Sequence, residues 1–424
     1  MTVSGFSIAD HYDTPEVSCW ERIPAKVLLR EVDQRSSTGD EEVLGLSGSK
    51  GVLKRSEMGQ RSSEANSYVG YKKVKSGQLI SNKMQAWNGM FGISPHDGIT
   101  SPDYAVFEFV GDVESRFIEY VVRTKLYAAE FHCRSKGMGT GFLRLNPSEF
   151  LSTSFWLPPR KTQTAIADFL DLETARIDSL VKKKKRFLKL TAQRVDALVD
   201  KAISDPSIPR VRFENVVSRM LRPVILSEHE ELVRLGLYNR GRGIFKKPAA
   251  DETSIGDSSF HFVRNRDLIL SGQFAWEGAV ALATEEEEGC VVSHRYPVYR
   301  AIEGVKTAYL LGLLRSSFGD FILNDASRGS AGRNRPLNTW RLGKEKIPIP
   351  SLGLQDEVDH ALAFERRLKK KTERSIALLN ETRAAIITAA VTGQIDVNSS
   401  DTEQKVDRDL DRIERQLTAR EVRA

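Results

Sequence analysis

An internal repeat constrains the fold of this 424-residue chain more than any other feature of its sequence. The second copy follows the first at an offset of 192 residues, and the register holds without a gap from about residue 135 to residue 202. A repeat of this length predicts one structural unit that is used twice. The gap-free matches are Ser135-Lys136-Gly137 with Ser327-Arg328-Gly329, Leu145-Asn146 with Leu337-Asn338, Pro158 with Pro350, Gln163 with Gln355, Leu170 with Leu362 and Ala192 with Ala384.

Upstream of this region the register of the repeat loosens. Leu79-Ile80-Ser81 resembles Ile269-Leu270-Ser271, and Trp87-Asn88-Gly89 resembles Trp276-Glu277-Gly278. In this alignment the second copy has one residue fewer between the two landmarks. We therefore expect a one-residue deletion at this point of the second copy.

Each copy ends in a segment that predicts one long helix. Pro and Gly are absent between Pro159 and Pro206, and again between Gly353 and Gly393. Some 40 helical residues span about 60 Å, and so long a helix is stable in water only when one face is packed. Apolar residues recur at spacings of three and four, as in coiled coils. These stripes are Ile166, Leu170, Ile177, Val181, Leu188, Val195, Leu198 and Ala202 in the first helix, and Val358, Leu362, Leu368, Ile376, Leu379, Ile386 and Ala390 in the second.

We expect the two helices to pack antiparallel on each other, and the alternative is that each packs on its own globular part. The stretch before each helix has short apolar runs separated by Gly, Asn, Asp and Pro, which predicts a small mixed sheet with a few helices. The expected strands include Tyr104–Val110, Val291–Tyr299 and Lys346–Pro350, and the expected helices include Ser115–Phe131 and Val305–Asn324.

The predicted fold class is α+β, with two mixed α/β domains joined by two long antiparallel coiled-coil helices in a pseudo-two-fold repeat.

The C-terminal tail has apolar residues at helical spacing, which indicates either a partner-binding helix or a frayed surface helix. These residues are Val406, Leu410, Ile413 and Leu417. The expected segments are a globular domain at 1–160, a spacer helix at 161–205, a second domain at 206–350, a second spacer helix at 351–396 and a charged tail at 397–424.

The composition predicts a cytoplasmic protein. Apolar residues make up 40% of the chain and charged residues 28%, a mixture typical of soluble globular proteins. No run of 18 apolar residues predicts a membrane span, and Met1–Asp13 lacks the apolar core of a secretory signal. The three cysteines, Cys19, Cys133 and Cys290, are far apart, which fits a reducing compartment and predicts no metal cluster.

Motifs for catalysis or metal binding are not recognisable. Gly45–Lys50 lacks the spacing of a phosphate-binding loop, and the seven histidines lack metal-ligand spacing. No G-x-S-x-G elbow or amino-methyltransferase motif occurs, and Asp103 with Glu108 fits a loop entering a strand better than a nuclease site. The acidic run Glu285–Glu288 predicts a solvated hairpin tip. The lack of recognisable motifs favours a binding protein without catalytic, cofactor-binding or metal-binding residues.

The positive charge of the chain is concentrated in a few places. The net charge is only +6, yet residues 50–90 carry eight basic and two acidic side chains. Gly-rich basic loops stand at equivalent places of the two copies, at 134–144 and 327–335. Glycine allows close backbone approach to a ligand, and basic side chains contact phosphates or guanine. The alternative for each loop is a mobile turn with solvated charges.

We expect Trp87 and Trp276 in the core, with base stacking as the alternative, and the run Lys182–Arg186 on a solvated helix face, with contact to the DNA backbone as the alternative. The candidate DNA-binding residues are basic or amide side chains in these regions. They are Lys54, Arg55, Lys72, Lys73, Lys75, Lys83, Gln85, Arg134, Lys136, Arg144, Arg240, Arg242, Lys246, Lys247, Arg264, Arg328, Arg333 and Arg335.

The first predicted helix resembles the conserved helix of type I restriction–modification specificity subunits. After Pro158-Pro159, the resemblance is carried by Gln163, Ile166-Ala167, Phe169-Leu170-Asp171, Thr174-Ala175, Ile177-Asp178 and Leu180. The second copy differs at its start, where Gln355–Val358 lacks the Ala-x-Phe-Leu-Asp portion. Its end resembles the closing segment of that family, through Leu379–Arg383, Ile386-Ile387 and Ala390–Asp396.

The resemblance implies a non-catalytic subunit with two target recognition domains, at 1–160 and 206–350, that read a bipartite, asymmetric DNA target. It also implies that the helices act as spacer and as docking surface for two methyltransferase (modification) subunits, which restriction subunits join. S-adenosylmethionine, ATP and Mg²⁺ would bind those partner subunits. The docking residues that it implies are Gln163, Phe169, Leu170, Ile177, Leu180, Leu379, Arg383 and Ile386.

Two other functions are compatible with the residues alone. One is a protein-interaction scaffold built on the same duplicated unit, with no role in binding DNA. The other is a small restriction–methylation enzyme whose motifs are unrecognisable, which the motif search disfavours.

Overall fold

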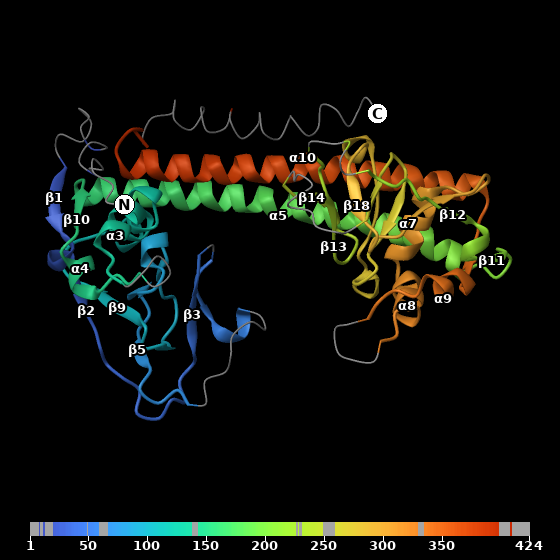
Figure 1. Cartoon of the computed structure of the whole chain (residues 1–424). Helices are drawn as coiled ribbons and strands as arrows, with labels where there is room; N and C mark the ends of the chain where they lie inside the picture. The colour runs from blue at the N-terminus through green and yellow to red at the C-terminus, as the bar shows by residue number, and fades with distance from the viewer. Residues whose placement is uncertain are drawn as a thin grey trace. The chain divides into compact units, whose positions relative to one another are not determined.

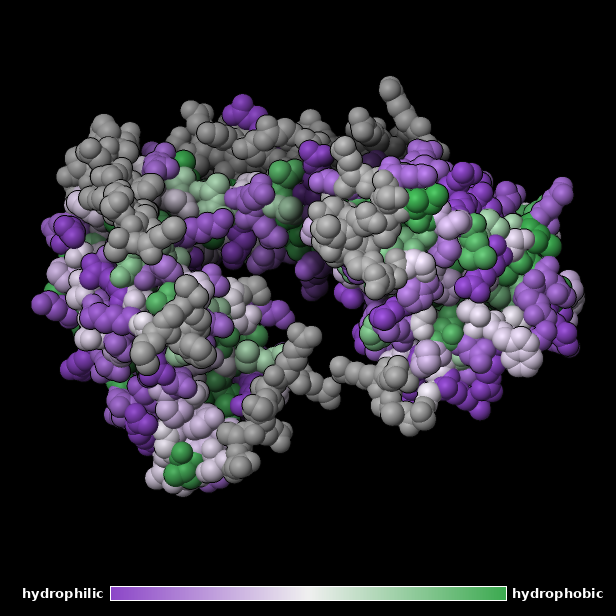
Figure 2. Space-filling model, viewed as in Figure 1, coloured by the Kyte–Doolittle hydropathy of each residue, from purple (hydrophilic) through white to green (hydrophobic). Residues whose placement is uncertain are grey.

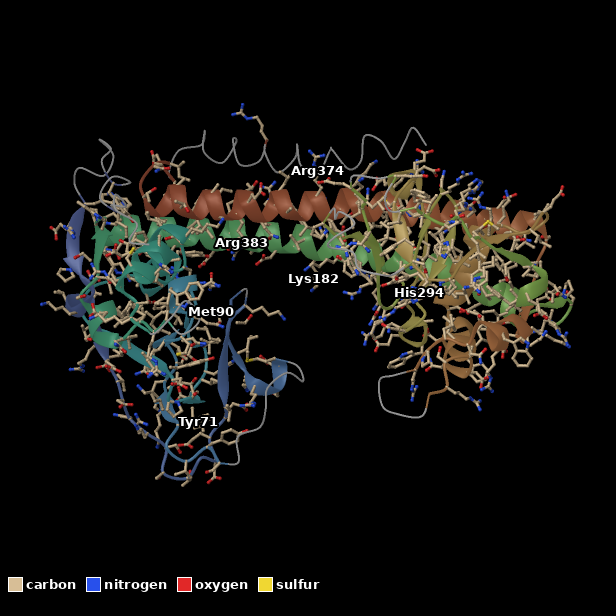
Figure 3. All side chains as sticks on the ribbon, viewed as in Figure 1. Tyr71, Met90, Lys182, His294, Arg374 and Arg383 are labelled. Atoms are coloured by element: carbon tan, nitrogen blue, oxygen red, sulfur yellow. The ribbon has the colours of Figure 1, made fainter. Side chains whose placement is uncertain are left out.

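The computed structural model describes residues 8, 12, 20–48, 50–58, 67–137, 143–225, 228, 231–248, 259–329, 335–397 and 408. The chain divides into two compact units, unit 1 (1–182 and 374–424) and unit 2 (183–373). Both long helices pass from one unit into the other, at Lys182 and at Arg374, which Figure 3 labels. Most of Met1–Asp13, most of the tail, residues 138–142 and Arg333 lie outside the described residues.

Unit 1 is built on a four-stranded antiparallel sheet with the order β2-β9-β6-β7, flanked by three two-stranded ribbons (Figure 1). The sheet strands are β2 (Leu29–Glu31), β6 (Leu79–Asn82), β7 (Phe91–Ile93) and β9 (Tyr104–Phe109). The ribbons pair β1 (Glu21–Pro24) with β10 (Ser154–Leu157), β3 (Leu44–Ser47) with β4 (Gly51–Lys54), and β5 (Lys72–Val74) with β8 (Gly98–Thr100). The helices are α1 (Ala25–Leu28), η3 (Arg55–Glu57), η4 (Ala86–Asn88), α2 (Ser115–Val122), α3 (Lys125–Arg134) and α4 (Pro147–Leu151).

Unit 2 has the same plan, with a four-stranded sheet of order β12-β19-β16-β17 and three ribbons. Its sheet strands are β12 (Val217–Arg219), β16 (Leu268–Leu270), β17 (Val280–Leu282) and β19 (Val298–Ala301). Its ribbons pair β11 (Arg210–Arg212) with β20 (Lys346–Pro348), β13 (Leu235–Tyr238) with β14 (Gly243–Lys246), and β15 (Phe260–Phe262) with β18 (Val291–Ser293). Its helices are η5 (Phe213–Asn215), η7 (Ala275–Glu277), η8 (Glu285–Glu287), α7 (Thr307–Arg315), α8 (Ser317–Asp325) and α9 (Thr339–Lys344).

The strand register corrects the upstream alignment of the repeat. Leu79 pairs with Ile93 as Leu268 pairs with Leu282, so that Leu79 corresponds to Leu268 at an offset of 189 residues. The η4 and η7 turns, which begin at Ala86 and Ala275, keep this same offset. The expected one-residue deletion between the landmarks is therefore wrong. The apolar run Leu268–Leu270 allows either alignment by residue type alone, and only the pairing decides between them.

The two long helices match their predicted extents to within a few residues. Helix α5 covers Arg160–Ser204 and helix α10 covers Leu352–Val391. Two residues beyond Val391, Gly393 has a φ of +70°, the left-handed conformation that commonly ends helices. All residues of both predicted apolar stripes are buried or partly buried.

Within each unit the two helices run antiparallel and share a core with the adjoining sheet and helices. In unit 1, Ile166 and Ile177 of α5 join Leu379 and Ala390 of α10 in one cluster with Phe117 of α2. In unit 2, the corresponding cluster contains Val195 and Val199 of α5, Val358 and Leu362 of α10, and Leu310 of α7. Each helix thus divides its packing between two units, and the alternative of one helix per globular part is wrong.

Three predicted elements are each divided in two. The expected helix Ser115–Phe131 is α2 followed by α3, and Val305–Asn324 is α7 followed by α8. The second helix of each pair is capped by a hydroxyl, since Thr124 accepts from the amide of Tyr127 and Ser316 from that of Gly319. The expected strand Val291–Tyr299 is β18 and β19, with a turn between them.

A buried glutamine fixes the start of each long helix. Gln163 accepts a hydrogen bond from the amide of Glu114 at 2.9 Å and donates one to the carbonyl of Pro158 at 2.9 Å. Gln355 accepts from the amide of Lys306 at 2.7 Å and donates to the carbonyl of Pro350 at 2.9 Å. The equivalent glutamines therefore make the same contacts in both units, each tying its long helix to the residue before α2 or α7.

We expect Gln355→Ala to lower the free energy of unfolding by about 1–3 kcal/mol, because a buried amide and a buried carbonyl lose their partner. The exposed Gln273 of the same unit provides the control, and Gln273→Ala should change stability by less than about 0.5 kcal/mol. Urea unfolding of the full-length chain, followed by far-UV circular dichroism, measures both values. Equal effects of the two substitutions would contradict the structural role of Gln355.

Candidate nucleic-acid interface

The two predicted basic loops lie beside equivalent tryptophan turns. In unit 1 the backbones of Lys136 and Arg144 pair with each other at 3.0 and 2.9 Å, and the amide of Leu145 donates to the carbonyl of Lys83 at 2.9 Å. In unit 2 the amide of Leu337 donates to the carbonyl of Gly272 at 2.8 Å. Both loops are thus tied to the strand end that leads into the η4 or η7 turn.

In unit 1 this arrangement brings Lys83 and Arg144 together. Partial burial, followed by the positive charges of Lys72 and Arg144, lowers the pKa of the Lys83 ammonium. Arg144 pairs with Asp103 at 2.7 Å and Lys136 pairs with Glu149 at 2.5 Å. Arg134, by contrast, pairs with Glu130 on its own helix at 2.5 Å. Lys83, Arg144 and Lys136 therefore form one group of predicted DNA-binding residues in unit 1.

In unit 2 the equivalent loop places one arginine, Arg335, over an aromatic ring. The guanidinium of Arg335 lies 5.0 Å from the centre of the Trp276 ring, within cation–π distance. Arg328 forms an ion pair with Asp325 of α8. The position of Gln85 in unit 1 corresponds to Phe274 in unit 2, and both side chains are exposed. The two loops thus share a position and differ in chemistry.

The two tryptophans are not core residues, and the prediction that they are is wrong. Trp87 and Trp276 are partly exposed, whereas the alanine before each is buried. Their indole N–H groups donate to the carbonyls of Met84 at 2.9 Å and Gln273 at 3.1 Å. Each ring therefore folds back over its own turn, because the small alanine occupies the core position.

A second equivalent pair, Lys75 and Arg264, was not recognised as such in the sequence. The amide of Lys75 donates to the side chain of Gln78 at 2.8 Å, and that of Arg264 donates to the side chain of Asp267 at 2.8 Å. Lys75 corresponds to Arg264, and Gln78 corresponds to Asp267, both at the offset of 189 residues. Lys75 also pairs with Asp97 at 2.9 Å, and Arg264 is exposed.

Asp267 organises basic residues that the sequence analysis missed. Its fully buried carboxylate accepts from Arg222 at 2.6 Å and from Arg300 at 2.8 Å. Because two arginines surround a single carboxylate, this group of three residues carries a net positive charge. Neither arginine stands in a basic run or a glycine-rich loop, so that no local pattern in the sequence marks them.

Lys72 is a buried structural residue, and its assignment to a DNA-binding surface is wrong. Its side chain is only 4% exposed, and its ammonium pairs with Glu31 at 3.5 Å and Asp33 at 3.2 Å. Burial raises the pKa of Asp33, but hydrogen bonds from Arg35 and Lys72 outweigh that effect, and the net result is a lowered pKa. The next residue after Lys72, Lys73, is half exposed, and its ammonium pairs with Glu41 at 3.4 Å. The alternation of faces along β5 separates these two lysines.

Two equivalent hairpins carry most other candidates, with Arg240 and Arg242 in the turn of one hairpin and Lys54 and Lys246 at the open ends of the two. Lys54 and Lys246 end the second strands of β3–β4 and β13–β14, and Gly51 and Gly243 begin them with positive φ angles. Arg55 lies 5.9 Å from the Tyr68 ring. Lys246 donates to the carbonyl of Glu286 at 2.5 Å, and Arg240, Arg242, Lys246 and Lys247 are all exposed.

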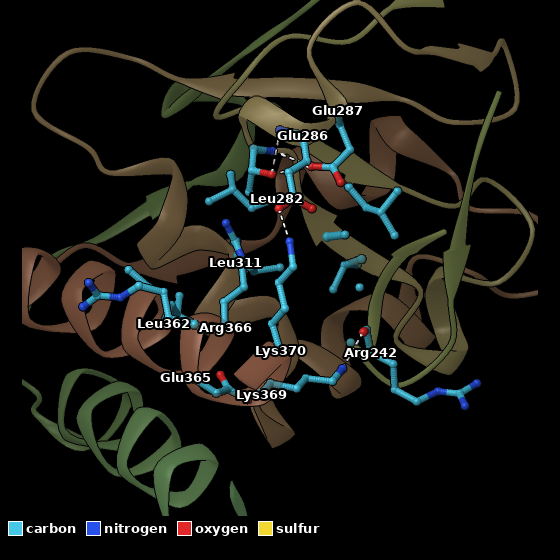
Figure 4. A pocket seen from close by; sticks show the side chains of 18 of the residues that line it. Arg242, Leu282, Glu286, Glu287, Leu311, Leu362, Glu365, Arg366, Lys369 and Lys370 are labelled. Atoms are coloured by element: carbon cyan, nitrogen blue, oxygen red, sulfur yellow. Dashed lines mark hydrogen bonds and ion pairs between the residues drawn. The ribbon is translucent and has the colours of Figure 1, made fainter. Parts of the chain in front are cut away.

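A cleft of about 550 Å³ in unit 2 lies beside this hairpin (Figure 4). Helix α10 lines one side of it and the β13–β14 hairpin and η8 line the other. Lys370 pairs with Glu286 at 2.5 Å, and Lys369 donates to the carbonyl of Arg242 at 3.0 Å. The lining includes six basic residues, Arg242, Arg315, Arg366, Arg367, Lys369 and Lys370, and four acidic ones, Glu285, Glu286, Glu287 and Glu365.

The acidic run Glu285–Glu288 is therefore more than a solvated hairpin tip. Thr284 caps the short η8 helix through a capping box with Glu287. The ammonium of Lys370 lowers the pKa of Glu286, and Glu288 accepts a hydrogen bond from the amide of Asn265 at 2.5 Å. The run anchors η8 to helix α10 inside unit 2.

The residues that were expected to dock partner subunits mostly face the interior of their own unit. Gln163, Phe169, Leu170, Ile177 and Leu379 are buried, and Leu180 and Ile386 are packed against the same core. Arg383, labelled in Figure 3, lies 3.9 Å from Asp178 of α5. The assignment of these buried side chains to a partner surface is wrong, because the periodicity that marks them is that of the packed face.

Helix α5 instead exposes other apolar side chains. Leu172 in unit 1 is 64% exposed, and Phe187 and Leu190 in unit 2 are 42% and 52% exposed. Most of the run Lys182–Arg186 is exposed, as predicted. Figure 2 shows a mainly hydrophilic surface with scattered hydrophobic residues. Among the described residues, no helix combines the length with the apolarity that a membrane span requires.

No family model and no curated protein matches the sequence. Solved structures do match. One of them is a chain from a structure of the complex assembly and conformational transition of the type I R-M system. Its TM-score is 0.55 and its sequence identity 15%, and the match covers 89% of the present chain and 99% of that chain. The HsdS subunit of Thermoanaerobacter tengcongensis has a TM-score of 0.45 and 16% identity, with 89% and 98% covered. The type I S subunit of M. genitalium has a TM-score of 0.46 and 11% identity, with 88% and 96% covered.

The chain shares the fold of the first of these chains, which comes from the type I R-M system. The match with a TM-score above 0.5 carries this conclusion, and it spans nearly the whole of both chains. The predicted α+β fold with two long helices is thereby confirmed. At 15% identity the likeness concerns the fold, and the DNA-binding residues stay a prediction.

We expect Lys72→Met to lower the free energy of unfolding by about 1–2 kcal/mol, because Glu31 and Asp33 lose a buried ion-pair partner. Lys75 also pairs with a carboxylate, but its side chain is 70% exposed. Lys75→Met is therefore the matched control and should cost at most about 0.5 kcal/mol. Urea unfolding of both variants measures the difference in stability. If Lys72→Met is as stable as the unmodified chain but binds DNA more weakly, Lys72 is a DNA-binding residue after all.

Proposed function

We propose that the chain is the DNA sequence-specificity subunit of a type I restriction–modification complex and that it reads a bipartite, asymmetric target. The observation that carries the proposal is that two units with one strand order present different side chains at equivalent surface positions. Lys136 corresponds to Arg328, and Leu143 corresponds to Arg335. Unlike side chains at equivalent places would select unlike base pairs, so each unit would read its own half-sequence.

The long helices would set the gap between the two half-sequences, much as dimer geometry sets half-site spacing in other DNA-binding proteins. Each unit alone would bind with modest affinity. Joining two such units on one chain raises the overall affinity, because the second contact is made at a high effective concentration.

The modification subunits would dock on the outer faces of the helices. The exposed apolar side chains Leu172, Phe187 and Leu190 of α5 are the observation that supports this location. Restriction subunits would join that assembly. We expect the subunit itself to be non-catalytic and cytoplasmic, and S-adenosylmethionine, ATP and Mg²⁺ to bind the partner subunits.

Selection from a randomised double-stranded DNA library tests the central claim. The full-length chain, co-expressed with the modification subunit of its own genome, should recover two short sequences separated by a constant gap. Replacing residues 210–350 by the equivalent region of a related subunit should change only one of the two sequences. Recovery of no split sequence would favour the protein-interaction scaffold, and a change in both sequences would show that the units do not read independently.

Co-purification tests the docking surface. We expect Phe187→Ser combined with Leu190→Ser to lower recovery of the modification subunit at least 10-fold, because a partner would lose two apolar anchors, worth about 1.4 kcal/mol or more. The control is Lys185→Ser combined with Lys189→Ser, which changes the same exposed stretch of α5 but keeps both apolar side chains. Recovery of the modification subunit should be unchanged in this control. Equal recovery with both double variants would place the docking surface elsewhere.

A further inference from the structure

Arg240, at the tip of the β13–β14 hairpin, has a backbone conformation that side chains other than glycine rarely adopt. Its φ is +59°, in the left-handed region. Among the described residues, only Arg266 shares this property without being glycine, with a φ of +67°. A residue held in such a conformation implies that the surroundings impose it, and such residues cluster at ligand-binding sites.

The two arginines differ in what their side chains do. Arg266 donates to Asp359 of α10 at 2.6 Å, and this ion pair within unit 2 accounts for an arginine at that position. The side chain of Arg240 is exposed, and it forms no ion pair or hydrogen bond with any residue in the described part of the chain. The fold therefore gives no reason of its own for an arginine at position 240.

The backbone around Arg240 is held from both sides. Its amide donates to the carbonyl of Glu277 at 2.7 Å, and the amide of Gly241 donates to the carbonyl of Gly278 at 2.7 Å. Asn239 donates to the carboxylate of Glu277, and the carbonyl of Arg242 accepts from Lys369 at 3.0 Å, as Figure 4 shows for the latter. The root of the Arg240 side chain is thus fixed, while its guanidinium remains available.

The corresponding loop of unit 1 contains no arginine, since residues 48–50 read Gly-Ser-Lys. The loop between β3 and β4 comprises residues 48–50, whereas the loop between β13 and β14 comprises residues 239–242 and is one residue longer. Beside Arg240, the guanidinium of Arg242 lies 5.2 Å from the centre of the Tyr238 ring, and this tyrosine is 44% exposed. The tip of unit 2 therefore presents arginines on a rigid, partly aromatic support.

We propose that Arg240 reads a guanine in the half-sequence recognised by unit 2, an inference that rests on the proposed function. A guanidinium can donate two parallel hydrogen bonds to O6 and N7 of guanine, the commonest specific arginine–base contact. That contact requires the side chain to start from a defined position. A phosphate contact, by contrast, carries no sequence information and needs no fixed backbone, since a flexible basic side chain on an unstrained turn makes it equally well.

Selection experiments with Arg240→Gly test the inference. The full-length variant, with the same modification subunit and the same randomised duplex library, should lose preference for G·C at one position in the half-sequence read by unit 2. The discrimination at that position should fall about 5- to 150-fold. The half-sequence read by unit 1 should stay the same, and the melting temperature should not fall, because glycine adopts a φ of +59° without strain.

Arg266→Gly is the matched control, since it removes an arginine with the same backbone conformation and should leave both selected half-sequences unchanged. Arg240→Lys keeps the charge but removes the paired donors, and it should lose the same base preference. An unchanged selected sequence with Arg240→Gly would overturn the inference. So would a uniform loss of affinity for all sequences, restored by Arg240→Lys, which would identify a phosphate contact. If the unmodified chain selects no split sequence, the proposed function fails and the inference fails with it.

Discussion

The burial of one apolar face on each long helix is the constraint on which the rest of the structure depends. Helix α5 has 45 residues and α10 has 40, and most of the stability of a helix in a protein comes from packing its apolar face. Each helix half is covered by the other helix and by α2 or α7 within its unit. The cores of both units therefore require the helices. The core of unit 1 combines residues from two separate stretches, 1–182 and 374–424, whereas that of unit 2 lies within the continuous stretch 183–373.

Around these helices the duplicated framework has kept its internal hydrogen bonds while its surface has diverged. Gln163 and Gln355 make the same two contacts, and the turns at Trp87 and Trp276 have the same geometry. At the neighbouring surface positions the side chains differ in charge, size and aromatic character. Conserved geometry with altered side chains is what two reading surfaces of a single asymmetric target would need.

The candidate site could be predicted only where residues are consecutive in the sequence. The loops at 134–144 and 327–335 were placed at equivalent positions because their glycines and basic residues are visible as runs. Lys72 was misassigned, since a buried lysine and an exposed one look alike in a basic segment. Arg222 and Arg300 were missed, because the buried carboxylate of Asp267 that gathers them lies far from both in the sequence. Five of the eight predicted docking residues are buried for a related reason: the helical periodicity that made them recognisable also places them in the core.

The sequence by itself determined the duplication, the two long helices and their buried stripes, because periodicity and the absence of Pro and Gly act locally along the chain. It also determined the class of fold through the resemblance of those helices. The tertiary structure alone decided the register of the repeat upstream, the division of each helix between two units and the exposure of each basic side chain. These properties depend on which distant segments meet, and in particular on the contacts from Glu277, Gly278 and Lys369 that hold Arg240 in its left-handed conformation.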